Sequence, residues 1–191
     1  MCIRDSAYSA LINGIAVCSG YTECFKTFMD MLGIENATIS GEAGGQQHIW
    51  NVVNLDNHWY HVDVTWDDPV GSSSDYIDHS YFNISADDMA LDHTWDRSRY
   101  SAYEKCGAKY SYCRYKKLPL ISNVNQLNKL IYSTVKNKTA HIEFTTTYNA
   151  DLKEAISRTG QQLSYSYKNI DRVNYTLYSC LLYTSDAADD K

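Results

Sequence analysis

The stretch GIAVCSGYTECFKTFMDMLGI, residues 14–34, decides the fold. It predicts a helix from about Cys18 to Leu32, because apolar residues recur there at spacings of three and four: Tyr21, Phe25, Phe28, Met29 and Leu32. Gly33 supplies a stop for this helix. We expect it to be the central helix of the domain, with its apolar face against a sheet. Cys18 at its start is either a small buried hydrophobe or a nucleophile.

Two strands are expected next, at HIWNVV (48–53) and WYHVDVTW (59–66), on either side of the turn-forming NLDN. A loop of two or four residues between them places His48 and Asp63 on the same face, directly opposite or one diagonal apart. Their β-carbons then lie roughly 5–8 Å apart. A three-residue loop would turn one of them away. We therefore predict that Asp63 accepts a hydrogen bond from one imidazole nitrogen, leaving the other for Cys18.

This combination is the one that cysteine catalysis requires. The thiolate needs a base beside it and a third group to orient that base. A helix N-terminus also favours negative charge on a thiol, because its N–H groups and dipole stabilise the thiolate. Cys18 stands at such a point, with Gly14 before it and Gly20 after it.

The second strand alternates between two kinds of residue. One face is expected to be core: Tyr60, Val62, Val64 and Trp66. The other carries the more polar set: Trp59, His61, Asp63 and Thr65.

Outside this hairpin the chain predicts a mixed organisation. A short helix is expected over 6–14, stopped by Asn13-Gly14, and a helical turn capped by Ser85 follows a strand end at YFNI. From about residue 116 we expect an α-β-α-β tail: helix 123–137, strand 139–147, helix 149–160 and strand 171–178. The predicted class is α+β: a helix carrying the cysteine, packed on an antiparallel sheet carrying His48 and Asp63.

Composition sets the broad class of protein. The chain has 191 residues, a formal net charge of −6 and 44% hydrophobic residues. One domain of ordinary size plus a small appendage fits this length. The negative net charge gives no basic surface of the kind that binds nucleic acid. The apolar runs of the sequence are too short to span a membrane.

Both ends of the sequence look foreign to the fold. MCIRDS at the start and CLLYTSDAADDK at the finish resemble translated adapter sequence at the edges of metagenomic reading frames. We therefore expect residues 1–6 and 180–191 to be non-native, residues 7–115 to form the core and residues 116–179 to form the appendage.

The motifs around the three candidate residues resemble the bacterial transglutaminase-like domain, a branch of the papain-like cysteine enzymes. The resemblance rests on NGIAVCSGYTECFKTFMDMLGI followed by HIWNVVNLDNHWYHVDVTWDDP, and covers about residues 7 to 96, including YFN at 81–83 and DH at 92–93. It implies that Cys18 is the nucleophile, His48 the general base and acid, and Asp63 the orienting carboxylate. That family has further N-terminal helices before the cysteine motif, so the chain is expected to be an N-terminally truncated fragment.

The resemblance also implies the reaction class. A thiolate would attack an amide carbonyl and form a thioester acyl-enzyme. Water as acceptor gives a peptidase or amidase, and an amine gives transglutamination. We favour hydrolysis, with peptide or cell-wall peptide substrates, no cofactor and no metal, and export or the cell envelope as the location. The oligomeric state stays open. A non-catalytic interaction module on the same fold is the alternative, and a metal-dependent hydrolase using His48, His61 and Asp63 is a third reading.

Some neighbouring residues have less certain roles. Trp50, Trp59 and Tyr21 are candidates for the substrate groove, whereas Trp66 is expected to pack. Cys106 and Cys113 could form a small disulfide loop if the protein is exported.

Overall fold

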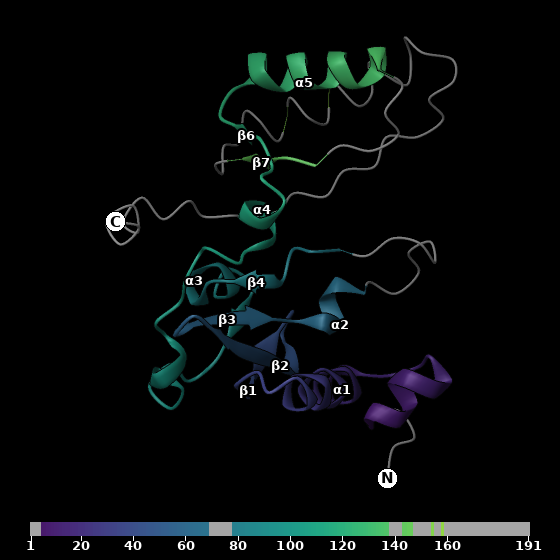
Figure 1. Cartoon of the computed structure of the whole chain (residues 1–191), viewed down its shortest axis with the longest axis vertical. Coiled ribbons are helices and arrows are strands. Elements are labelled where there is room, and N and C mark those ends of the chain that lie inside the picture. The colour runs from purple at the N-terminus through teal and green to yellow at the C-terminus, as the bar shows by residue number, and fades with distance from the viewer. Residues whose placement is uncertain (1–4, 69–77, 138–142, 147–153, 155–157, 159–191) are drawn as a thin grey trace. The chain divides into compact units, whose positions relative to one another are not determined.

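The computed structural model describes residues 5–68, 78–137, 143–146, 154 and 158. The chain divides into two compact units, with the boundary between Tyr115 and Lys116 (Figure 1). In the described residues, no helix is long and apolar enough to cross a membrane.

The first unit begins with a short helical turn and the central helix. The turn, η1, is π-helical and covers Ser9–Asn13, and Gly14 ends it with a φ of 64°. The helix α1 covers Cys18–Met31, within one residue of the prediction. Gly33 follows with a φ of 69°, a left-handed conformation in which glycine is unstrained.

A five-stranded antiparallel sheet forms the body of this unit, in the order β4-β3-β2-β1-β5. Its strands are β1 (Asn36–Ala43), β2 (Gln46–Leu55), β3 (His58–Val62), β4 (Phe82–Ile84) and β5 (His93–Thr94). The sequence predicts β2, β3 and the strand end at β4, but β1 and β5 were not predicted.

The turn between β2 and β3 sets the register that the site depends on. It consists of Asp56 and Asn57, both left-handed, with φ of 53° and 62°. Two left-handed residues are the requirement of a type I′ hairpin turn. The strands then pair Val52 with His61, so that His48 and Asp63 share a face, one diagonal apart. The predicted parity is confirmed.

The predicted strand over 59–66 is wrong in its second half. β3 ends at Val62, and the short helix α2 covers Val64–Asp67. The cause is the Asp63 side chain, whose Oδ1 accepts hydrogen bonds from the backbone N–H of Thr65 at 3.0 Å and Trp66 at 3.2 Å. A carboxylate in this position caps a helix and ends the strand.

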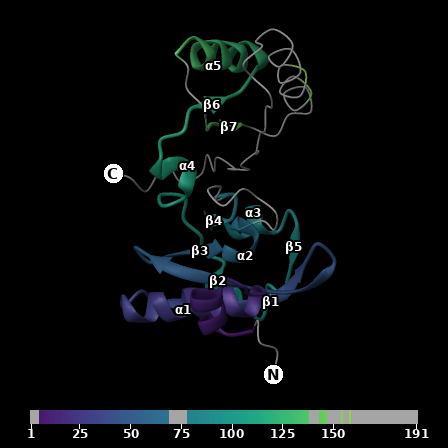
Figure 2. The same ribbon diagram turned by 90° about the vertical axis from the view of Figure 1, so that its right-hand side faces the viewer.

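Both faces of the sheet are covered, so neither face of β3 is a solvent face. On one side lies α1, which runs alongside β1 and β2 (Figure 2). Its side chains pack against a cluster of Val53, Tyr60 and Val62. On the other side lies a second cluster: Ile39, Trp50, Val52, Ile84 and Met89. Met89 comes from α3 (Ala86–Met89), which the Ser85 side chain caps as predicted.

The apolar stripe of α1 is only partly buried. Phe25 and Met29 pack against the sheet cluster, but Phe28 is 44% exposed and Leu32 is 69% exposed. The prediction that the whole stripe faces the sheet is therefore wrong for Phe28 and Leu32.

The rest of the first unit consists of short elements: η2, a 3₁₀ turn at Ser101–Tyr103, and α4 at Tyr112–Tyr115. In the segment between η2 and α4, the carbonyl of Lys105 accepts a hydrogen bond from the N–H of Trp59, and the N–H of Gly107 donates to the carbonyl of Trp59. This segment therefore pairs with the start of β3.

The second unit is described only in part. Its elements are β6 (Leu120–Ile121), α5 (Val124–Lys136) and β7 (Thr145–Thr146), with β6 and β7 parallel. Ile121 and Leu127 form a small core with Leu130, Ile131 and Phe144. The helix predicted over 123–137 is confirmed, and most of the helix over 149–160 and all of the strand over 171–178 lie outside the described residues.

Candidate active site

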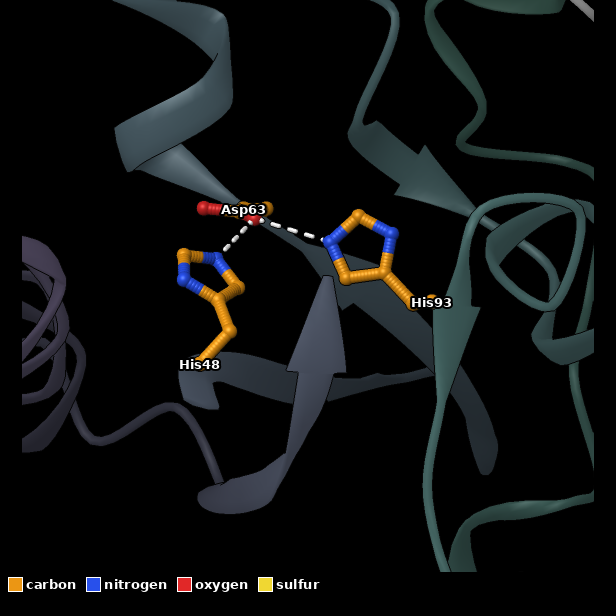
Figure 3. A group of neighbouring side chains, drawn as sticks. All are labelled: His48, Asp63 and His93. Carbon is orange, nitrogen blue, oxygen red and sulfur yellow. Dashed lines mark hydrogen bonds and ion pairs between the residues drawn. The ribbon is translucent and has the colours of Figure 1, made fainter. Parts of the chain in front are cut away.

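The centre of the site is the pair of His48, on β2, and Asp63, directly after β3. The Nε2 atom of His48 lies 2.6 Å from Oδ2 of Asp63. The side chains are 8% and 1% exposed. Figure 3 shows that the other ring nitrogen of His48, Nδ1, faces away from Asp63. The structure thus brings these two predicted residues together and leaves one imidazole nitrogen for another partner.

Asp63 is held as an anion. Burial raises the pKa of its carboxyl, but the hydrogen bonds and charges of His48 and His93 outweigh burial and lower it below the usual value. The two backbone N–H groups on Oδ1 add to this, because hydrogen bonds to the charged form favour it.

The second histidine on Asp63 is one that the sequence analysis did not place in the site. His93 lies on β5, and its Nε2 is 3.1 Å from the same Oδ2 atom of Asp63. Its Nδ1 is 2.6 Å from Oδ1 of Asp92. Asp92 and His93 belong to the family pattern quoted above. However, β5 has only two residues, and its pairing with Ala43, which brings His93 to Asp63, cannot be predicted from the spacing of residues in the sequence.

Cys18 is the first residue of α1, and its thiol is free and partly exposed. One turn later, the Thr22 hydroxyl donates to the carbonyl of Ile49 at 3.0 Å. The Asn51 side-chain amide donates to the carbonyl of Thr22 at 3.2 Å. These bonds fasten the start of α1 to the segment of β2 that follows His48.

The N-terminus of α1 has no capping side chain. Val17 precedes the helix in an extended conformation and provides no side-chain cap. The N–H groups of the first turn are therefore free of a capping side chain, which suits an anion. Within the described part of the chain, no hydrogen bond joins Cys18 Sγ to His48.

Two of the predicted groove and metal residues are core residues instead. Trp50 is fully buried, and its Nε1 donates to Nδ1 of His61 at 3.0 Å. Trp50 therefore cannot line an open groove. His61 is also fully buried, and burial lowers the pKa of its imidazole to about 3, so it is neutral.

The other aromatic candidates lie at different places. Tyr21 donates from its hydroxyl to Asp68, and burial together with that carboxylate raises the pKa of Tyr21 to about 12. Trp59 packs edge-on against Tyr103, with ring centroids 4.6 Å apart. Trp66 packs on His93 at 4.7 Å and on Tyr81, as expected of a packing residue.

A metal ion could be held by the same cluster that surrounds Asp63. One ligand atom from each of His48, Asp63 and His93 lies within 4.8 Å of the others. This set differs from the predicted one, because His61 faces Trp50 rather than Asp63. The same atoms are already hydrogen-bonded to one another, and these hydrogen bonds are enough to explain why the three side chains lie close together.

Cys106 does not form the disulfide considered with Cys113. Its thiol is free, and burial raises its pKa to about 11. The Cys106 sulfur accepts a hydrogen bond from the N–H of Ala86 at 3.2 Å, at the start of α3.

Comparison with known proteins agrees with the predicted family. Residues 2–64, which include Cys18, His48 and Asp63, match the model of the transglutaminase-like superfamily. A solved structure described as a TGase is 22% identical, over 38% of this chain and 19% of that chain, with a TM-score of 0.33. A similarity of that extent does not by itself define the fold. No curated protein matches the chain.

The superfamily carries out, in general, acyl transfer on a cysteine. The mixed architecture of a helix and an antiparallel sheet is compatible with it. Residues 2–64 of this chain are therefore similar to the transglutaminase-like superfamily.

Proposed function

We propose that the chain performs cysteine-dependent acyl transfer on amide bonds, with Cys18 as nucleophile, His48 as general base and acid, and Asp63 as the orienting carboxylate. The observation that carries the proposal is the His48–Asp63 contact of 2.6 Å, with Nδ1 of His48 left over. The bonds between Thr22 and β2 support it, because they fasten the helix of Cys18 to the strand of His48.

In the proposed reaction each of the three residues has one role. His48 Nδ1 takes the proton of the Cys18 thiol, and the negative carboxylate of Asp63 stabilises the imidazolium that forms. The thiolate attacks the amide carbonyl, and we assign stabilisation of the oxyanion to the N–H groups at the start of α1. His48 then gives its proton to the leaving amine, and a thioester remains on Cys18.

The acceptor decides the product. Water releases a carboxylic acid, and a primary amine gives a new amide. We favour water, which makes the protein a peptidase or amidase acting on peptide or cell-wall peptide substrates. The basis for this choice is analogy within the family.

The test uses p-nitrophenyl acetate as a small acyl donor, with peptide mapping by mass spectrometry to identify the acylated thiol. We expect rapid acylation of Cys18, lost in Cys18→Ala and slowed about 100-fold or more in His48→Ala. His58→Ala is the matched control, because His58 lies on the same hairpin and bonds only a turn carbonyl. Equal acylation of Cys18 in the parent and His48→Ala would contradict the proposal.

A second step separates hydrolysis from transamidation. The acyl-enzyme is allowed to turn over in the presence and absence of an alkyl amine. Free acetate as the main product supports the hydrolase, and the acetylated amine as the main product supports amide exchange.

Metal-dependent hydrolysis is the second candidate, because three ligand atoms lie within 4.8 Å of one another. It predicts activity that survives Cys18→Ala and is abolished by a chelator. A protein with no acylation and no metal-dependent hydrolysis would fit the interaction module.

A further inference from the structure

The carboxylate of Asp63 is shared by two histidines. Its Oδ2 atom lies 2.6 Å from Nε2 of His48 and 3.1 Å from Nε2 of His93 (Figure 3). An ionised carboxylate only accepts hydrogen bonds. Both Nε2 atoms must therefore carry a proton and donate it to the same oxygen.

The other nitrogen of His93 also meets a carboxylate. Nδ1 of His93 lies 2.6 Å from Oδ1 of Asp92, and the second oxygen of Asp92 accepts from the Tyr81 hydroxyl at 2.6 Å. Asp92 is 43% exposed, whereas the His93 side chain is fully buried. Each ring nitrogen of His93 therefore lies within hydrogen-bond distance of a carboxylate oxygen, and the two contacts fix the orientation of the buried ring.

In the part of the chain that the structure describes, the titratable side chains around His93 are Asp63, Asp92, His48 and Tyr81, with the ring centroids of His48 and Tyr81 at 5.6 and 5.4 Å. His61 is a further neighbour, on which His93 acts electrostatically. The other ring contacts are Trp50 and Trp66, which shield the cluster from water.

Without His93, Oδ2 of Asp63 would have a single partner in a buried site. Its Oδ1 would still be fixed by the N–H groups of α2, but the position of Oδ2 would rest on His48 alone. A buried carboxylate with one donor less is costly and less firmly held. His93 therefore fixes the carboxylate that in turn fixes His48.

We propose that His93, held by Asp92, is a positioning residue for the acyl transfer: it holds Asp63 as an anion with Oδ2 aimed at His48. This inference rests on the proposed function. His93 acts through Asp63 and touches neither the thiol nor the acyl group.

The first test measures protonation directly. In the protein labelled with ¹⁵N-histidine, NMR at neutral pH is expected to show a proton on Nε2 of His93, the nitrogen that lies 3.1 Å from Asp63. A His93 that carries its proton on Nδ1 alone would overturn the inference, because Nε2 could then not donate to Asp63.

The second test measures acylation of Cys18 by p-nitrophenyl acetate in His93→Leu and in His61→Leu. His61 is the matched control, because it is an equally buried histidine that, among the described residues, is hydrogen-bonded to Trp50 and not to Asp63. We expect His93→Leu to slow acylation roughly 10- to 100-fold and His61→Leu to leave it nearly unchanged. His93→Gln, which can still donate to Asp63, should restore part of the rate, and it serves as the test if His93→Leu does not fold.

The outcomes separate the two proposals. If parent and His48→Ala are acylated at the same rate, the proposed function fails, and the positioning role fails with it. If the parent is faster than His48→Ala but His93→Leu equals His61→Leu, only the role of His93 is wrong.

Discussion

At the scale of single residues, Asp63 connects local structure with the site. Its Oδ1 atom ends β3 by capping α2, and its Oδ2 atom binds His48 and His93. The cap fixes the side-chain rotamer, so the same bonds that end the strand aim Oδ2 at the histidines. Local backbone chemistry and the geometry of the site therefore depend on one carboxylate.

Asp67 is a second acidic residue whose behaviour can be tested. Burial, with Asp78 and Asp63 nearby, raises the pKa of its carboxyl from 3.8 to about 8. Between these values the folded protein holds a proton that the unfolded chain has lost, so stability falls as the pH rises through this window. We expect Asp67→Asn to remove that fall, so that the variant gains stability over the parent as the pH rises toward 8, by up to about 5 kcal/mol at about 1.4 kcal/mol per pH unit.

The measurement for Asp67 is urea denaturation of both proteins at several pH values from 4 to 9. The Asn side chain can still accept from the N–H of Tyr81, as Asp67 does at 2.9 Å. Parallel stability curves for the two proteins would show that Asp67 is not protonated in the folded state.

At the scale of elements, the sequence predicted the central helix and the β2–β3 hairpin but not the strands that surround them. The period of α1 and the parity of His48 and Asp63 are local properties, so they can be worked out from spacing. β5 has only two residues, and its pairing with Ala43 is a long-range contact that no local pattern encodes. His93 was missed as a site residue for that reason.

The end of β3 shows a second reason why a residue pattern alone does not predict the structure. Tyr60, Val62, Val64 and Trp66 alternate as a strand would, but the Asp63 cap overrides that alternation. In the same way, the stripe on α1 predicts an apolar face but not how much of it the sheet covers. Phe28 and Leu32 remain exposed.

Gly41 controls the distance between β1 and β5. A β-carbon at this position would lie 2.2 Å from the carbonyl oxygen of Thr94 and 2.9 Å from the Trp50 ring. We expect Gly41→Ala to displace β5, which carries His93, and to cost about 1–3 kcal/mol of stability. Acylation of Cys18 should slow in the same variant.

Thermal and urea denaturation check this prediction. Ser40→Ala is the matched control, because Ser40 is its exposed neighbour on β1 and a surface change there stays within about 0.5 kcal/mol. Equal stability of Gly41→Ala and Ser40→Ala would disprove the role of Gly41.

Thr22 tests the attachment of α1 to β2. Thr22→Val keeps the shape of the side chain and removes the hydroxyl that donates to the Ile49 carbonyl. We expect a loss of about 1–2 kcal/mol and slower acylation of Cys18, because the start of the helix is less firmly held beside His48.

Thr27→Val is the control for Thr22. The Thr27 hydroxyl bonds a carbonyl of its own helix, on the exposed side. Its loss should change stability by less than about 0.5 kcal/mol. If both variants lose the same stability, the bond from Thr22 to β2 has no special role.

At the scale of the whole molecule, the chain is two units that each have their own core. The first contains the candidate site, and the second contains the small cluster around Leu127. The change of sequence texture near residue 116 coincides with the division between Tyr115 and Lys116. The predicted bounds of the core and appendage remain predictions.

Limited digestion with trypsin tests this division. Arg114, Lys116 and Lys117 are exposed at the boundary. In the first unit, by contrast, Lys26 and Arg97 form ion pairs with Asp30 and Glu104. We expect an N-terminal fragment ending at residues 114–117 to accumulate first. The digest is run under reducing conditions because Cys113 is disulfide-bonded. Early cleavage at Lys26 or Arg97 would contradict a compact first unit.

The most direct test of the account is the pH dependence of Cys18 alkylation by iodoacetamide, in the parent and in His48→Ala. Cys24 and Cys106 are internal references, because burial raises the pKa of each thiol. We predict that Cys18 reacts fast well below the ordinary thiol pKa of about 8.5, and that His48→Ala removes this advantage. If Cys18 reacts like an ordinary thiol in both proteins, or is inaccessible in both, the chain has no thiolate–imidazolium pair and the proposed acyl transfer is wrong.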